Sequence, residues 1–177
     1  MSSENRINSI WRATTGPTQV VPVGFNVSRS GDPLSSDRPN LKPGFSNSPT
    51  KGVTAGCDGL PRELWGQKLG TPDLYFDPCA FSLPEAGTYG NLSRNTLIGP
   101  GLFNVDFGLV KNTPLPLHEG MNLEFRAEFF NILNRANFTN PAASLFLNTG
   151  ARNTNAGKIT STSVDNREVQ FGLKLTF

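Results

Sequence analysis

The stretch "MNLEFRAEFF" (121–130) alternates between apolar and polar side chains from Met121 to Phe129. On a β-strand, successive side chains point to opposite faces, so this period of two predicts a strand with one apolar and one polar face. The apolar face would hold Met121, Leu123, Phe125, Ala127 and Phe129. The polar face would hold Asn122, Glu124, Arg126 and Glu128.

The same period recurs on both sides of this stretch. "LFNVDFGLVK" (102–111) places Phe103, Val105, Phe107 and Leu109 on one face, and "REVQFGLKLTF" (167–177) places Val169, Phe171, Leu173, Leu175 and Phe177 on one face. Two weaker segments precede them. One would align Ile7, Ser9, Trp11 and Ala13; the other would align Val21, Val23 and Phe25. Pro22 weakens the second because proline cannot donate to a β-ladder. The sequence therefore predicts about five strands in an all-β fold.

The connections between these segments are very unequal. Residues 28–101 and 131–166 form long segments rich in turn residues, whereas 14–17 and 112–120 are short. Bacterial outer-membrane barrels join their strands by short periplasmic turns and long outer loops. If the chain ends in the periplasm, both long connections fall outside. A strand of about ten residues, tilted near 40°, also covers the roughly 25 Å apolar band of such a barrel.

A soluble β-sandwich is the alternative, because a half-buried strand in a sandwich shows the same alternation. Two observations favour the barrel. Long structureless loops are unexpected inside a compact soluble domain. The composition, with 36% apolar and 17% charged residues, also argues against a compact soluble core. The expected fold is thus part of a transmembrane β-barrel with long irregular extracellular loops.

Cys57 and Cys79 both lie in the first long connection. Two cysteines in a segment predicted to face the oxidising cell exterior favour a disulfide, with two free thiols as the alternative. Zinc is not expected, because it needs further ligands and the sole histidine, His118, falls on the other side of the membrane in this topology.

Other function classes find little support. The net charge is +2 without a basic cluster, so nucleic acid is not an expected partner. No nucleophile elbow, P-loop, dinucleotide fingerprint or zinc-protease motif occurs, and neither catalysis nor a cofactor is expected. Glu124, Arg126 and Glu128 line one strand face, which in a barrel is the polar lumen. Arg94 and Asn95 belong to a turn-rich approach to a strand; contact with a ligand at the barrel mouth is a second interpretation.

Several ordered motifs resemble the C-terminal barrel end of TonB-dependent receptors. They are "YFDPCAFSLPEAGTYGNLSRNTLIGPGLFNVDFGLVKNT" (75–113), "LEFRAEFFNILNRANF" (123–138) and "GKITSTSVDNREVQFGLKLTF" (157–177). The likeness is greatest to the Oar-like group, whose members carry a carboxypeptidase-regulatory-like domain, and "SRSGDPLSSDRPNLKPG" (28–44) is similar to an outer loop of that group.

This resemblance implies a barrel of about 22 strands, plugged by an N-terminal domain, that takes up ligands with energy passed from the inner membrane. Residues 1–177 would be its C-terminal part, comprising an outer loop (28–101), a hairpin (102–130), a second outer loop (131–166) and a terminal strand (167–177). The partners would be outer-membrane lipid, the remaining barrel and plug, and the energy-transducing inner-membrane complex, reached through N-terminal parts absent from this chain. The start of the chain shows no signal peptide.

The resemblance also implies a role for the terminal strand. In such receptors an alternating last strand that ends in Phe is read by the outer-membrane assembly machinery. The residues at the matching positions here are Val169, Phe171, Leu173, Leu175 and Phe177. Alone, the chain would have two unpaired sheet edges and is expected to be inactive as a truncated fragment. The alternative function is a self-contained secreted or cell-surface β-rich adhesion module.

Overall fold

The computed structural model describes residues 4–31, 37–117 and 119–177. The chain divides into two compact units. The first, here called the sheet unit, comprises Met1–Thr15, Gly101–Asn137 and Thr162–Phe177; the second, the loop unit, comprises Gly16–Pro100 and Phe138–Ser161. Within the described residues, no helix has the length and apolar character needed to cross a membrane.

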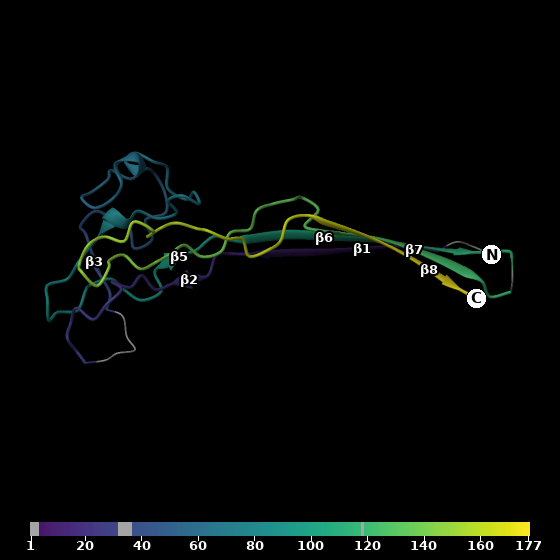
Figure 1. The fold of residues 1–177 in the computed structure, drawn as a ribbon, viewed down its shortest axis with the longest axis horizontal. Coiled ribbons are helices and arrows are strands. Elements are labelled where there is room, and N and C mark those ends of the chain that lie inside the picture. Colours follow the sequence, from purple (N-terminus) through teal and green to yellow (C-terminus); the bar gives the residue numbers. More distant parts are fainter. Residues whose placement is uncertain (1–3, 32–36, 118) are drawn as a thin grey trace. The chain divides into compact units, whose positions relative to one another are not determined.

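The sheet unit is built on four long antiparallel strands, drawn as the extended arrows in Figure 1. In sheet order they are β1 (Glu4–Thr14), β6 (Leu102–Pro114), β7 (Asn122–Phe130) and β8 (Glu168–Thr176). Their lengths run from 9 residues in β7 and β8 to 13 in β6. The three strongest alternating segments and the first weak segment are therefore strands, and the expected all-β, antiparallel, partial-barrel fold is confirmed.

The strand register gives this sheet two chemically distinct faces. Ile7 of β1 lies opposite Leu109 of β6, and Trp11 lies opposite Val105. Phe107 lies opposite Phe129 of β7. Directly opposed residues point to the same side of a sheet, so the apolar rows of successive strands join. The rows of β7 and β8 join through Leu123–Leu175, Phe125–Leu173, Ala127–Phe171 and Phe129–Val169. One apolar face thus crosses all four strands.

The ends of the strands agree with the predicted loop asymmetry. Thr14 lies opposite Leu102, and Phe130 lies opposite Glu168, so the connections 15–101 and 131–167 leave from the same end of the sheet. The short turn 115–121 lies at the other end, where Leu115 N–H donates to the Met121 carbonyl over 2.9 Å. Every long connection is on one side, which is the pattern of outer-membrane barrels.

The second weak segment is not a barrel strand, and that expectation was wrong. Only Thr18–Gln19 is extended there, as β2, paired with β5 (Leu97–Ile98). Pro22 has no backbone N–H to donate to a β-ladder. Val21 and Val23 are buried in the core of the loop unit. Consequently β1 pairs directly with β6, the long sheet has four strands, and the first long connection begins at residue 15 rather than 28.

The loop unit has little regular structure but does have a core, which the composition did not predict. A second short pair joins β3 (Asn40–Leu41) to β4 (Phe81–Ser82), and two 3₁₀ turns form η1 (Arg62–Leu64) and η2 (Pro78–Ala80). Both long connections contribute apolar side chains to one buried cluster. Its members include Val21, Val23, Phe76, Phe81, Leu92, Leu97, Leu145 and Phe146.

Two asparagines in the sheet unit redirect the chain after β7. Asn131 has φ 47°, in the left-handed region that Asn tolerates better than most residues, and the strand ends there. Ile132 N–H donates to the Val105 carbonyl, and Asn137 Oδ1 accepts from Phe103 N–H over 2.8 Å. Both asparagine side chains are almost fully buried. Residues 131–137 therefore run beside the start of β6, satisfying backbone groups beyond the end of β7.

Candidate functional site

The polar face of the sheet carries most of the charged side chains of the long strands. Asn122, Glu124, Arg126 and Glu128 share one face of β7, as the alternation predicts. Arg126 Nε lies 2.9 Å from Glu124 Oε1, and Glu124 is directly opposite Lys174 of β8. Gly172, opposite Arg126, leaves room for the long arginine side chain. This face is suited to water or to other polar groups.

A second group of polar residues lies at the loop-bearing end of the same face. Here the β-sheet register places Phe130 opposite Glu168, and Asp106 lies one position before the Phe107–Phe129 pair. Asp106 Oδ1 accepts hydrogen bonds from Asn131 N–H and from Asn104 Nδ2, both over 2.9 Å. Together with Asp165 these residues line a hollow of about 230 Å³. Sequence reasoning did not identify this group, because its members come from three separate segments.

The opposite face is apolar and largely uncovered. Phe171 is 66% exposed and Leu173 is 71% exposed, and Ile7 and Trp11 of β1 are similarly open. The predicted terminal row, Val169, Phe171, Leu173, Leu175 and Phe177, lies on or just beyond β8, and all five side chains are exposed. Exposed apolar surface of this extent marks a surface that contacts lipid or another apolar partner.

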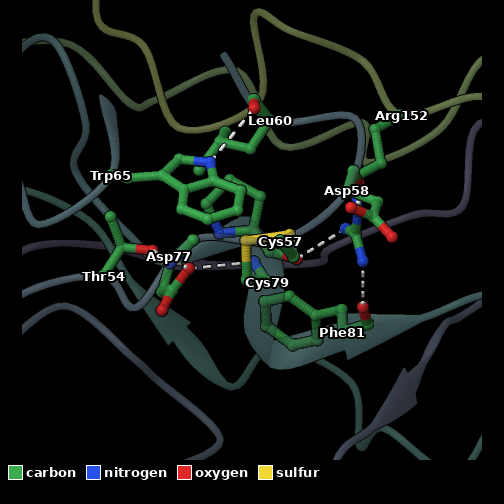
Figure 2. Close-up of a disulfide and its surroundings, with 11 residues drawn as sticks. Thr54, Cys57, Asp58, Leu60, Trp65, Asp77, Cys79, Phe81 and Arg152 are labelled. Atoms are coloured by element: carbon green, nitrogen blue, oxygen red, sulfur yellow. Dashed lines mark hydrogen bonds between the residues drawn. A yellow bond between two sulfur atoms is a disulfide. The ribbon is translucent and has the colours of Figure 1, made fainter. Parts of the chain in front are cut away.

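The loop unit contains a disulfide between Cys57 and Cys79 (Figure 2). Their sulfurs are 2.02 Å apart and their Cα atoms 5.6 Å apart. Asp77 Oδ1 accepts from both Thr54 Oγ1 and Cys79 N–H, each over 2.9 Å. The side chain of Asp77 therefore holds the backbone before Cys57 against the turn that carries Cys79.

Gly56, beside the disulfide, is required by a close approach. Its φ is +82°, and a Cβ there would lie 2.2 Å from the Trp65 ring. The Trp65 indole Nε1 donates to the Leu60 carbonyl over 3.2 Å (Figure 2). A residue larger than glycine would have to displace the indole and adopt an unfavourable backbone conformation.

Arg152 connects the two long connections within the loop unit. Its guanidinium donates to three carbonyls, those of Asp58 at 3.1 Å, Pro78 at 2.9 Å and Phe81 at 3.0 Å. It also lies 5.2 Å from the centroid of the Phe146 ring. Partial burial lowers the pKa of Arg152 from its usual value, while the nearby Asp77 and Asp58 carboxylates oppose that shift. Two of the carbonyls flank the disulfide in sequence, so the arginine and the disulfide stabilise the same region.

Arg94 and Asn95 form an exposed turn in the loop unit. Asn95 has φ 55°, which makes a turn role sufficient to explain this asparagine. Neither residue lines the hollow beside Asp106. Their contact with a ligand stays a prediction.

The arrangement of four long antiparallel strands, with one apolar face and long connections at one end, has a counterpart among known families. Residues 4–170 match the family model described as "Outer membrane beta barrel domain". The chain belongs to this family. The match begins at the start of β1 and ends within β8, so it includes β1, β6 and β7 of this outer-membrane β-barrel domain and the first residues of β8. No curated protein and no solved structure matches the chain.

Family membership accounts for the two faces of the sheet. In outer-membrane barrels, outward-facing side chains contact lipid and inward-facing side chains line a polar interior. This outer-membrane β-barrel domain is not closed, because β1 and β8 each have one edge without a partner strand among the described residues. Over the same residues, no group of three His, Cys, Asp or Glu side chains is arranged to hold a metal ion. His118 lies outside the described residues.

Sequence reasoning overlooked Asn131, Asn137 and Arg152. An Asn-rich run, "NILNRANF" (131–138), directly after an alternating segment is a usable signal for left-handed turns and backbone capping. Arg152 had no such signal, since its three acceptors are 71 to 94 positions away in the chain.

Proposed function

We propose that this chain is the C-terminal barrel segment of a TonB-dependent outer-membrane receptor of the Oar-like group. The single observation that carries the proposal is the two-faced sheet, whose apolar side crosses all four strands and is most exposed on β1 and β8, while its other side holds most of the charged residues. The family match supports the barrel and the outer membrane. The receptor type rests on the motifs at 75–113, 123–138 and 157–177.

On this proposal the apolar face contacts lipid and the polar face lines the lumen. Asn122, Glu124, Arg126 and Glu128 would then face the plug or water inside the barrel. The Arg126–Glu124 ion pair and Lys174, which lies opposite Glu124, give that face the polar character of a barrel interior. A self-contained adhesion module would instead need to bury Phe171, Leu173 and Trp11, all of which are exposed.

The open edges of β1 and β8 imply further strands in the working assembly. In lipid each unsatisfied backbone group costs several kcal/mol, so a stable sheet must continue until it closes. Known single-chain barrels have at least about eight strands, more than the four of this sheet. The remaining barrel, a plug and the energy-transducing inner-membrane complex would therefore be partners, and this segment alone would not transport a ligand.

The two long connections would form an extracellular cap. Both leave one end of the sheet and fold together around a shared core, and the disulfide belongs to a second, smaller cluster with Leu60 and Leu64. An oxidising exterior suits that disulfide. The assembly machinery would recognise the terminal row that ends at Phe177. We propose no enzymatic reaction.

Tag insertion on intact cells tests this topology. Gly44 sits in an exposed turn with open space around it, and Pro116 sits in the short turn between β6 and β7. In the assembled barrel that contains this chain, an epitope inserted after Gly44 should be reached by antibody on intact cells. One inserted after Pro116 should be reached only after permeabilisation. The reverse pattern would refute the receptor topology.

A further inference from the structure

We propose that Arg135 binds the phosphate group of a membrane lipid at the loop-bearing end of the apolar face. The proposal rests on the proposed function, in which that face contacts lipid, and it adds a headgroup chemistry and the residue that recognises it. The site consists of Arg135, Phe103 of β6 and Trp11 of β1, all in the sheet unit.

Contact with Phe103 places the Arg135 guanidinium on the apolar face. The guanidinium carbon is 5.6 Å from the centroid of the Phe103 ring, and Phe103 belongs to the apolar row of β6, opposite Ala13. Phe103 also meets Trp11 edge to face, with centroids 6.4 Å apart at 75°. Trp11 is 69% exposed. An arginine thus lies over one ring of an aromatic pair at the end of this face.

The backbone of Arg135 is held in place by two asparagine side chains. Arg135 N–H donates to Asn131 Oδ1 over 3.1 Å, and Asn131 Nδ2 donates to the Arg135 carbonyl, also over 3.1 Å. Asn137 Nδ2 donates to the same carbonyl over 3.4 Å. These bonds use the main chain of Arg135 and leave its guanidinium for another partner. A side chain on a fixed backbone loses less conformational entropy when it binds.

The positive charge of Arg135 is not paired with a carboxylate. Neither ion pair found within the described residues involves it. The apolar rows of the four strands contain no Asp or Glu. At this end of the sheet, Asp106 and Glu168 alternate with members of the apolar rows and therefore point to the opposite face. The apolar face thus offers a cation to an anionic group from outside the chain.

The position of Arg135 along the sheet suits a headgroup layer. A cation that faces lipid is costly at the bilayer midplane and nearly free of cost at the interface. Lys111, the charged residue of the apolar rows, lies eight positions from Phe103 along β6. At roughly 3.3 Å per residue and a tilt near 40°, the two positions are about 20 Å apart along the membrane normal, close to the roughly 25 Å apolar band. Lys111 and Arg135 therefore lie at opposite edges of that band.

A lipid phosphate fits this site better than a neutral headgroup or a soluble anion. Guanidinium is planar, can donate two parallel N–H bonds to phosphate oxygens and can stack on an aromatic ring at the same time. Exposed aromatic rings such as that of Trp11 are common at the membrane interface. The apolar rows below Phe103 would contact the acyl chains of the same lipid. A soluble anion has no part that uses those rows.

The experiment uses the assembled barrel that contains this chain, solubilised in an uncharged detergent. A photoactivatable phosphatidic acid is the probe, and diacylglycerol with the same acyl chains is the phosphate-free probe. Cross-linking near Phe103 is measured by mass spectrometry on the tryptic peptide 95–111, whose ends are Lys or Arg sites present in every variant. Thermal unfolding is measured without lipid.

Three variants are compared with the native protein. Arg135→Gln removes the charge, and Arg135→Lys keeps the charge but loses the planar pair of donors. Arg12→Gln is the matched control, because Arg12 lies near the same end of the sheet but in a polar row, opposite Asn104. Like Arg135, Arg12 forms no ion pair among the described residues.

The proposal expects the half-saturating concentration of phosphatidic acid to rise about tenfold in Arg135→Gln, as for the loss of one charge-assisted contact. Arg135→Lys should lie between Arg135→Gln and the native protein, and Arg12→Gln should bind as the native protein does. Diacylglycerol should label all four proteins weakly and equally. If Arg135→Gln does not assemble, Arg135→Lys decides, with severalfold weaker labelling expected.

Equal labelling of the native protein and the Arg135 variants would overturn the proposal, and a lower Tm in those variants would then assign Arg135 a structural role. Equal labelling of the native protein by the two lipids would show an apolar contact only. Displacement of the lipid by a comparable concentration of inorganic phosphate would indicate a soluble anion, also against the proposal. Absence of the site with the tag at Gly44 outside would retain the receptor topology. Lipid binding with reversed tags would retain the site and reject that topology.

Discussion

The ring of Phe125 in β7 stacks on the ring of Phe171 in β8, with centroids 6.1 Å apart and planes inclined by 18°. Phe171 also meets Phe129 edge to face, with centroids 6.5 Å apart at 88°. The three rings connect β7 to β8 on the apolar face. They act across the last strand pair of the sheet, where β8 has no second neighbouring strand among the described residues.

Removing the Phe171 ring should weaken this strand pair by a limited amount. Lipid can replace the lost apolar contact. The expected loss in free energy of unfolding is therefore that of the two ring–ring contacts, about 1 to 2 kcal/mol. Phe171→Ala should lower the denaturant midpoint of the assembled barrel in lipid more than Leu173→Ala does. Leu173 is similarly exposed on the same strand and lies opposite Phe125, but it has no ring and so makes no ring–ring contact. Equal losses would show that the stacking adds nothing.

Phe177 should matter for assembly more than for stability. It is 93% exposed, so its ring makes little contact within this chain, and packing alone predicts a small effect of Phe177→Ala. If the terminal row is recognised by the assembly machinery, the same change should reduce outer-membrane levels of the barrel severalfold. Phe107→Ala is the control, because it removes an equal ring that packs on Phe129 at 6.0 Å. Similar levels of the two variants in isolated outer membranes would exclude the recognition role.

The alternation of side chains was enough to predict the long strands of the sheet unit. Phe107 and Phe129 were each assigned to an apolar face from period two alone, and the register sets them opposite one another. The strand predicted around Val21 is not formed, because the apolar side chains of that segment pack in the core of the loop unit instead. Val21 and Val23 pack with Leu145, more than a hundred positions later, and no local pattern encodes such a partner.

The candidate site at the loop-bearing end was beyond sequence reasoning for a similar physical reason. The sequence places Asp106 in the strand segment 102–111 and Glu168 in the terminal segment 167–177, and gives no sign that the two are close. Their proximity depends on the register of β7 between them, which sequence patterns do not specify. The contacts of Arg152 could not be predicted either, since they form only when the two long connections fold together.

Loss of the disulfide should loosen the loop unit. The cysteines are 22 positions apart, and closing a loop of that size contributes about 3 kcal/mol on the chain-entropy model. Cys57→Ser combined with Cys79→Ser should therefore make residues 50–80 more susceptible to protease on intact cells. Treating the native protein with a reductant should reproduce this effect and leave the double variant unchanged. Identical cleavage of oxidised and reduced native protein would contradict a stabilising role.

Arg152→Ala should destabilise the loop unit by about 3 kcal/mol, because three carbonyls lose a charged donor. Arg62→Ala is the matched control. Arg62 lies 5.2 Å from the Trp65 ring, the same distance that separates Arg152 from Phe146, but it has no comparable set of carbonyl acceptors in the described structure. Its replacement should cost less than about 1 kcal/mol. Hydrogen exchange of the amides around the disulfide measures both, and equal exchange rates would mean that the carbonyl contacts are unimportant.

The orientation of the two faces of β8 is the central claim, and site-specific quenching tests it most directly. Single cysteines placed at Phe171, Leu173, Gln170 and Lys174 of the assembled barrel would carry an environment-sensitive fluorophore. Quenchers attached to lipid chains should act on positions 171 and 173, whereas a water-soluble quencher should act on 170 and 174. The predicted result is that the effective quencher alternates from one residue of β8 to the next, since neighbouring strand positions face lipid and lumen in turn. Uniform quenching along β8, or lipid quenching at 170 and 174 instead, would contradict the account.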